Sequence, residues 1–317
     1  MKKISLLCCI ALAFIGAYYL INKTRTPDNI VYNMHEHIQS KKQLPKFLEA
    51  MDNMDIGKTV LVGSPKETIH GGTGFTKYKR NNDVVLEIAK TYPDRFIFFP
   101  TVGIEENAID IVKEYIKKGG KGIKLYNGHY DSFYKTMGPL NRKELLPVYA
   151  YAEKNNLPII FHTNPYHENI KNEFIDILTK YPNLKINCPH FCLSSINTTR
   201  FEALMDAHPN LYTDISFGSF AEDGLKRISK DPEKFKKLIN KYPDRFLFGS
   251  DTVITDNKRK TVQWYTSLIG CYKDLLEKDT YTCAVEPDFT ETFSGLALDE
   301  EIRKKIYTTN AQTFLGI

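Results

Sequence analysis

The sequence predicts an α/β fold in which eight parallel strands and their helices close into a (β/α)8 TIM barrel. Eight short apolar runs, rich in β-branched and aromatic residues, follow residue 28, and longer amphipathic stretches separate them. This alternation indicates a parallel sheet covered by helices, and eight such units fit one closed barrel. An open doubly wound sheet is the alternative, but it gives no reason for eight units. The predicted strands cover residues 29–35, 58–63, 96–102, 122–126, 157–162, 184–189, 211–216 and 246–250.

The predicted helices lie between these strands, and turn signals mark where several of them end. Tyr-Pro-Asp or Tyr-Pro-Asn occurs at 92–94, 181–183 and 242–244. Proline stops a helix there, and Asn or Asp favours the turn that follows. The stretch 262–299 is less regular, and we expect it to cover part of the barrel. The helices are expected near residues 42–54, 80–92, 105–118, 140–155, 170–181, 195–208 and 231–241.

Composition is that of a globular protein with a mild charge. The 317 residues are 42% hydrophobic and 26% charged, with 43 Lys and Arg against 38 Asp and Glu, for a net charge of +5. The basic residues are spread out, so no clustered basic face for nucleic acid is predicted. A small molecule is the expected partner, and the sequence leaves open whether the chain forms a homodimer.

The N-terminus differs from the rest of the chain. A positive start at residues 1–3 precedes an uncharged apolar run over residues 4–21. This pattern predicts a secretory signal or an uncleaved membrane anchor over residues 1–24, ahead of the barrel at 28–317. We therefore expect an exported protein that is membrane-anchored, periplasmic or extracellular, with cleavage undecided.

Export would place the other cysteines in an oxidising compartment. Cys271 and Cys283 lie close together in the loop-rich C-terminal part, and we predict that they form a disulfide. Cys188 and Cys192 flank His190, and we interpret them as thiols in the core or near the site.

Polar side chains recur where the predicted strands end. His35 and His37 close the first strand, and because they are two residues apart in an extended chain they point to the same side. His162 ends the fifth strand, His190 the sixth, and Asp251 follows the eighth. The C-terminal strand ends of a barrel converge on one site, so these side chains are expected to meet. Imidazoles and a carboxylate together are ligands that suit zinc.

With these residues in place, the chain resembles the amidohydrolase superfamily, in particular its amidohydrolase-2 branch of metal-dependent barrel enzymes. The resemblance covers residues 30 to 317. It is carried by His35-Glu36-His37, the strand ending in His162, Pro189-His190, Phe248-Gly249-Ser250-Asp251 and Asn310-Ala311-Gln312-Thr313-Phe314-Leu315-Gly316.

The resemblance implies one divalent metal ion, usually zinc, held by His35, His37, His162 and Asp251. His190 would stand beside a metal-activated water and orient it or steady the developing oxyanion. The metal would lower the pKa of that water towards ~7. Asp251 would accept its proton and later pass it to the leaving group.

Four further residues are candidates for binding the substrate. Lys124 lies near the end of the fourth strand, where two-metal members of the superfamily carry a carboxylated lysine that bridges the metals. It could instead bind a substrate carboxylate or reach solvent. Tyr126, His129 and His167 lie just beyond strand ends, in loops that should face the site.

The predicted function is hydrolysis of a small molecule with a carbonyl or related electrophile, such as a lactone or cyclic amide. The alternative is a non-oxidative, metal-dependent decarboxylase of an aromatic or unsaturated carboxylic acid. That reaction needs cations for the substrate carboxylate, and Lys124 and Arg80 are the candidates. A third hypothesis is an anchored binding protein that keeps the barrel without turnover.

Overall fold

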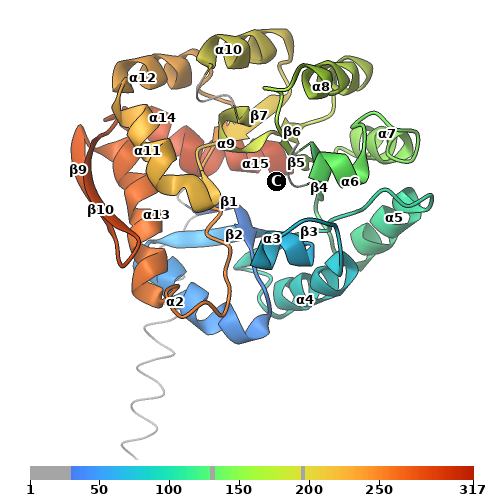
Figure 1. Cartoon of the computed structure of the whole chain (residues 1–317), viewed down its shortest axis with the longest axis horizontal. Helices are drawn as coiled ribbons and strands as arrows, with labels where there is room; N and C mark the ends of the chain where they lie inside the picture. The colour runs from blue at the N-terminus through green and yellow to red at the C-terminus, as the bar shows by residue number, and fades with distance from the viewer. Residues whose placement is uncertain (1–29, 129–132, 194–196) are drawn as a thin grey trace, which may run out of the picture.

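The computed structural model describes residues 30–128, 133–193 and 197–317, and in this part of the chain eight parallel strands form the centre of the molecule (Figure 1). Each strand begins a unit of strand and helix, as the sequence predicts. The strands are β1 (Val31–His37), β2 (Ile56–Val62), β3 (Phe96–Phe99), β4 (Ile123–Gly128), β5 (Ile159–Thr163), β6 (Ile186–Asn187), β7 (Leu211–Asp214) and β8 (Phe246–Leu247).

Parallel pairing and a few single bridges close these strands into a barrel. One ladder joins β1, β2 and β3, and another joins β4 through β8. The two ladders meet where Thr101 bridges Lys124 after β3. On the other side, the Met34 amide donates to the Phe248 carbonyl over 2.8 Å, so β1 lies beside β8. The predicted closed barrel is confirmed.

Seven helices follow the predicted positions and surround the strands. Figure 1 shows α7, α8, α10 and α12 along one side of the ring and α2, α4 and α5 along the other. Their apolar residues face the sheet, as amphipathic helices require. These helices are α2 (Leu44–Asn53), α4 (Tyr78–Thr91), α5 (Ala108–Lys118), α7 (Leu146–Lys154), α8 (Glu168–Lys180), α10 (Thr198–Ala207) and α12 (Pro232–Lys241).

Shorter elements decorate the connections. The connection after β2, over residues 64–80, contains a short helix and the start of α4. The additional helical elements are η2 (Lys41–Gln43), α3 (Lys66–His70), α6 (Lys135–Met137), α9 (Pro189–Cys192), η4 (Gly218–Phe220), α11 (Ala221–Ser229), α14 (Glu300–Lys304) and η5 (Lys305–Thr309).

Several strand boundaries differ from the prediction, and the changes in β1 and β6 concern the site. β1 continues through His37 rather than ending at residue 35, because its register with β2 continues as far as His37 opposite Val62. β6 is only two residues long. Pro189 has no amide hydrogen with which to extend the ladder, and the chain turns immediately after Cys188.

The irregular stretch after residue 262 is more ordered than the sequence indicates. It forms α13 (Val262–Glu277) and an antiparallel hairpin of β9 (Thr280–Val285) and β10 (Phe289–Ser294), which lies against α13. The Cys271–Cys283 disulfide joins α13 to β9, as predicted.

The C-terminal helix α15 (Asn310–Leu315) closes the barrel opposite the site. Phe314 and Ala311 pack with inward-facing strand residues such as Tyr32 and Leu247. Asn310 donates hydrogen bonds of 2.8 Å to the carbonyls of residues 243 and 246, which fixes the helix to β8. The closing sequence motif therefore seals the end of the barrel where its strands begin.

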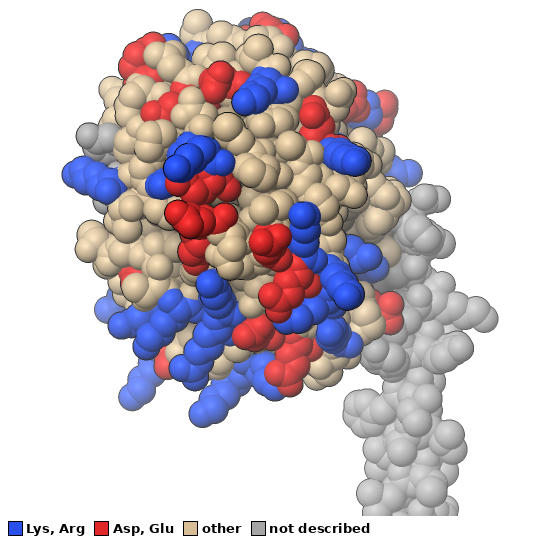
Figure 2. All heavy atoms as spheres, turned by 90° about the vertical axis from the view of Figure 1, so that its right-hand side faces the viewer, with Lys and Arg blue, Asp and Glu red and all other residues tan. Residues whose placement is uncertain are grey.

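The surface carries both signs of charge side by side. Figure 2 shows Lys and Arg next to Asp and Glu on one face. Ion pairs such as Lys118–Glu114 occur on the surface of the molecule. The predicted signal or anchor over residues 1–24 lies outside the described residues. In the part of the chain that the structure describes, no helix combines the length and the apolarity needed to cross a membrane.

Candidate metal centre

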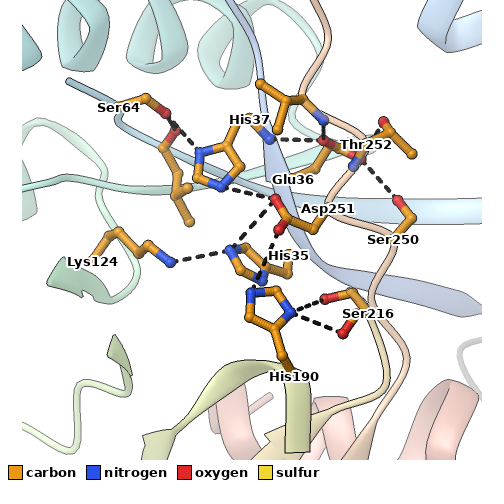
Figure 3. Close-up of polar contacts among 12 residues, drawn as sticks. His35, Glu36, His37, Ser64, Lys124, His190, Ser216, Ser250, Asp251 and Thr252 are labelled. Carbon is orange, nitrogen blue, oxygen red and sulfur yellow. Dashed lines mark hydrogen bonds and ion pairs between the residues drawn. The ribbon is translucent and has the colours of Figure 1, made fainter. Parts of the chain in front are cut away.

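Side chains from three strand ends meet in one buried group at the C-terminal end of the barrel (Figure 3). His35 comes from β1, while His190 and Asp251 follow β6 and β8. One ligand atom from each of these three residues lies within 4.8 Å of the other two, and all three residues are buried. This convergence of residues far apart in the sequence is what the strand-end pattern predicts.

The Asp251 carboxylate stands at the centre of this group. Its Oδ1 lies 3.1 Å from His37 Nε2 and 4.0 Å from His35 Nε2, and its Oδ2 lies 3.5 Å from His190 Nε2. Despite this closeness, Oδ1 is buried and accepts no well-aligned hydrogen bond from any described residue. A carboxylate oxygen left in this way beside imidazole nitrogens is a donor that a cation would satisfy.

Each of the three imidazoles is oriented by a partner at Nδ1. His37 Nδ1 lies 2.8 Å from Ser64 Oγ, and Ser64 Oγ itself donates to the Val62 carbonyl. His190 Nδ1 lies 2.8 Å from the Ser216 carbonyl, which can only accept, so this nitrogen carries the hydrogen. In all three rings the Nε2 atom is therefore the one that faces Asp251, which is the arrangement typical of metal-ligating histidines.

Asp214, at the end of β7, orients two of these rings, and the sequence reasoning missed it. Its Oδ2 accepts from His35 Nδ1 over 3.1 Å, and its Oδ1 accepts from the His190 amide over 3.1 Å. Ser216 Oγ donates to the same Oδ1 over 2.6 Å. Asp214 lies within the predicted strand 211–216 and ends the observed β7, so its place at a strand end becomes visible only in the structure.

Burial sets the charge state of the group. Burial and the nearby Lys124 ammonium lower the pKa of His35 to about 4, and burial likewise lowers the pKa of His37. Burial alone would raise the pKa of Asp251, but His35 and His37 hold it well below its usual range. The site thus presents neutral imidazoles at His35 and His37 and an ionised carboxylate at Asp251, which are the protonation states that metal binding needs.

Glu36 points away from this group, as its place between the two histidines predicts, and it secures the loop after β8. Its Oε2 accepts from Ser250 Oγ, from the Thr252 amide and from Thr252 Oγ1 at 2.8–3.0 Å. Its Oε1 accepts from the amides of His37 and Val253. Glu36 therefore ties β1 to the segment that carries Asp251.

The remaining ligand candidate, His162, lies beside the group and not within it. Its ring centroid is 5.0 Å from that of His190, whereas the three mutually close residues are His35, His190 and Asp251. Ligation by His162 stays a prediction.

Lys124 is the buried cation of the site. Its Nζ lies 3.0 Å from His35 Nε2 and 4.7 Å from the centre of the Tyr126 ring. Burial lowers the pKa of Lys124 to about 8, although Asp251 and Asp214 favour the charged form. Solvent contact, one of the three roles considered for Lys124, is excluded because its side chain is fully buried.

The other candidates for substrate binding are placed less centrally. Tyr126 is buried, with its hydroxyl 3.3 Å from His37 Nδ1 and 3.1 Å from the Gly63 carbonyl, so it packs behind His37. His167 precedes α8 and its ring packs against Tyr166. His129 lies outside the described residues. Substrate contacts by these residues stay predictions.

The interpretation of Cys188 and Cys192 as free thiols is wrong. The two cysteines form a disulfide across the turn that carries His190. The prediction placed Cys188 in a strand that continues to residue 189, whereas the chain turns after Cys188 and brings the two sulfurs together.

A divalent metal ion fits the donor set of this site. His35, His190 and Asp251 would hold it, with His37 next to Asp251 as a further imidazole. The structure is therefore that of a closed α/β barrel with a candidate metal centre at the C-terminal ends of its strands.

The sequence model of the family described as Amidohydrolase matches residues 73–317, so the chain belongs to the amidohydrolase family. The matched region begins after β1, so the family match does not include His35 and His37. Their place in the site rests on the structure. No curated protein matches the chain.

Solved structures share the fold at low sequence identity. A probable 2-pyrone-4,6-dicarboxylic acid hydrolase from Acinetobacter baumannii is 14% identical, with a TM-score of 0.60 over 90% of this chain and 99% of its own. A 2,6-dihydroxybenzoate decarboxylase from Rhizobium is 16% identical, with a TM-score of 0.59 over 90% and 98%. A 5-carboxyvanillate decarboxylase from Novosphingobium aromaticivorans, solved with manganese, is 14% identical, with a TM-score of 0.54 over 93% and 100%. Hydrolases and decarboxylases both occur among these neighbours.

Proposed function

We propose that this protein is a metal-dependent hydrolase of a small molecule with a lactone, cyclic amide or similar carbonyl group. The observation that carries the proposal is the buried Asp251 carboxylate, surrounded by three imidazoles that each turn Nε2 towards it. When bound, a divalent metal ion, with zinc preferred for this donor set, supplies a Lewis acid that polarises a carbonyl and makes water more acidic.

The residues of the chain divide the remaining work. Asp251 is placed to take a proton from the attacking water, through the carboxylate oxygen that does not bind the metal ion, and to return it to the leaving group. His190 is fixed through Nδ1 by Ser216, so its Nε2 can orient that water or stabilise negative charge on the substrate oxygen. Asp214 holds His35 and the His190 backbone in register for both tasks.

Lys124 supports an anionic substrate. It is fully buried, and its Nζ contacts His35 Nε2, the nitrogen that would bind a metal ion. Once His35 Nε2 is engaged, the Lys124 ammonium loses this acceptor and becomes available to a carboxylate. The 2-pyrone-4,6-dicarboxylic acid named for one structural neighbour is a lactone with carboxylates, which is the substrate class that this combination suggests.

The alternative is a non-oxidative decarboxylase, and the same Lys124 observation favours it. The neighbours that are decarboxylases act, by their names, on aromatic acids. Arg80, the second cation considered for this reaction, is exposed on α4, so Lys124 alone remains to hold the carboxylate inside the site.

One assay separates the two reactions. The metal-loaded protein is incubated with a panel of carboxylated lactones, cyclic amides and hydroxybenzoates, and both acid and carbon dioxide are measured. We expect acid release from a lactone without carbon dioxide, and no turnover by an Asp251→Asn variant. Carbon dioxide from a hydroxybenzoate would establish the alternative, and tight ligand binding without metal or turnover would establish a binding protein. Metal analysis of the purified chain, expected near one ion per chain, tests the bridging role of Lys124, because two ions would support it.

We also propose that the barrel works in an oxidising compartment outside the cytoplasm. The two disulfides, Cys188–Cys192 and Cys271–Cys283, support this location because such bonds persist in oxidising environments. Fractionation of cells that express the full chain, followed by mass mapping without reductant, tests it. Recovery in the cytoplasm with Cys188, Cys192, Cys271 and Cys283 as free thiols would contradict it.

A further inference from the structure

The segment that carries His190 has an unusual backbone. Four consecutive residues, His190 to Leu193, have φ values of 62°, 54°, 53° and 49°. This left-handed region brings the Cβ of an L-residue close to the following carbonyl oxygen, so non-glycine residues visit it singly and seldom in succession. None of the four positions is a glycine, and something must therefore hold this turn.

A disulfide closes the same turn. Cys188 and Cys192 are joined with their Cα atoms 4.7 Å apart, and His190 is the middle residue of the covalent ring they form. Both cysteines are completely buried, so the bond is a permanent part of the fold rather than an accessible thiol pair.

We propose that the Cys188–Cys192 disulfide is a positioning device for His190. It keeps the left-handed turn closed, and so directs His190 Nε2 to within 3.5 Å of Asp251 Oδ2. The inference depends on the proposed function only in that His190 belongs to the metal centre. The two cysteines touch neither substrate nor metal in this proposal and act through the turn alone.

Other contacts also hold the turn, and they make the proposal testable. Thr213 Oγ1 donates to the Cys188 carbonyl over 2.7 Å and accepts from the Cys192 amide over 3.1 Å. Phe191 packs into an aromatic cluster, with its ring stacked on Phe217 at 5.9 Å. If these contacts sufficed, removal of the sulfur bridge would leave His190 in place.

The experiment uses the full chain and two matched double variants. In Cys188→Ala with Cys192→Ala the ring is opened. In Cys271→Ala with Cys283→Ala the other disulfide is removed, which spans 12 residues instead of 4 and lies outside the metal centre. The loss of loop-closure entropy grows with loop length, so a purely global effect predicts the larger drop in melting temperature for the control.

Two readouts follow His190 itself. The first is the ¹⁵N–¹H spectrum of the histidine side chains in metal-free protein. The Nδ1–H group of His190 is hydrogen-bonded to the Ser216 carbonyl, so it should give a signal that is protected from exchange with solvent. The second is Zn²⁺ affinity measured by calorimetry with the metal alone. We expect opening the ring to remove the protected signal and weaken Zn²⁺ binding at least tenfold, while the control variant keeps both.

A rescue variant separates positioning from general destabilisation. Cys188→Ala with Cys192→Gly also lacks the bridge, but glycine accepts positive φ at no steric cost. We expect it to bind Zn²⁺ at least threefold more tightly than the double-alanine variant. Retention of the His190 signal and of wild-type affinity in the double-alanine variant would overturn the proposal, and so would equal losses in the control. If the wild-type chain itself binds no Zn²⁺, the proposed metal centre fails, while the spectrum of the metal-free protein still decides the role of the disulfide.

Discussion

Replacement of Asp214 by asparagine tests whether hydrogen bonds behind the metal centre determine the metal-binding nitrogen of His35. Oδ2 of Asp214 accepts from His35 Nδ1 and Asn187 Nδ2, and Oδ1 accepts from the His190 and Ser216 amides. A carboxylate can serve both sides, because each oxygen only accepts. An asparagine must turn its amide group, which only donates, towards one of them.

Both orientations of the asparagine side chain damage the site. If the amide faces His35, the ring must accept at Nδ1, so its proton moves to Nε2 and that nitrogen can no longer bind a metal ion. If the amide faces the other way, it meets the two backbone N–H groups of His190 and Ser216, and these buried donors lose their acceptor. Hydrogen bonds to a charged group are worth about 1.5–3 kcal/mol each. Loss of such an outer partner typically costs ~10–100-fold in metal affinity.

We therefore expect Asp214→Asn to weaken Zn²⁺ binding by about 1.4–2.8 kcal/mol, the equivalent of ~10–100-fold. Calorimetry on the folded variant gives the affinity, and urea denaturation shows how much of the effect is loss of fold. Asp256→Asn is the matched control, because Asp256 is exposed and accepts a hydrogen bond from Gln39 at the surface. Affinity within twofold of wild type in Asp214→Asn would refute the argument.

Three further perturbations probe the site. Asp251→Asn should abolish turnover and leave the melting temperature of the metal-free protein close to that of the wild type. A near-normal kcat would show that Asp251 does not transfer the proton. Glu36→Gln should lower the free energy of unfolding by roughly 2–3 kcal/mol. In the variant a side-chain NH₂ group would face hydroxyl and backbone donors that all bind the Glu36 carboxylate in the wild type. Urea denaturation measures this loss, and an unchanged midpoint would contradict it. Removal of metal with a chelator should lower the melting temperature, and added Zn²⁺ should raise it again in proportion to the logarithm of the Zn²⁺ concentration. A melting temperature that does not change with Zn²⁺ would contradict metal binding by the folded state.

Much of the fold could be predicted because barrel strands carry a strong local signal. The runs that became β2 and β4 are buried on both faces, so their apolar residues are visible in the sequence although each strand contains a lysine. Boundaries were less predictable where ladder pairing decides them, as at His37, where pairing with β2 extends the strand. Local propensity carries no information about such a partner.

The site shows the same division between local and long-range information. His35, His190 and Asp251 could be predicted because each follows an apolar run and the geometry of a barrel brings strand ends together. Asp214 ends its strand in the same way, but a carboxylate that holds other residues has no sequence pattern that separates it from an ordinary polar residue.

The turn at His190 marks where sequence reasoning stops, for a physical reason. Left-handed backbone is usually signalled by glycine or asparagine, and residues 190–193 contain neither. A chain without that signal can still adopt the turn when covalent and packing constraints outweigh the local cost, which here come from the Cys188–Cys192 bridge and the contacts of Phe191. The backbone cost at His190 is offset by the bridge, by Thr213 on β7 and by the aromatic cluster around Phe191. The position of His190 is therefore a property of the assembled barrel, and changes remote from the metal centre in sequence should alter it.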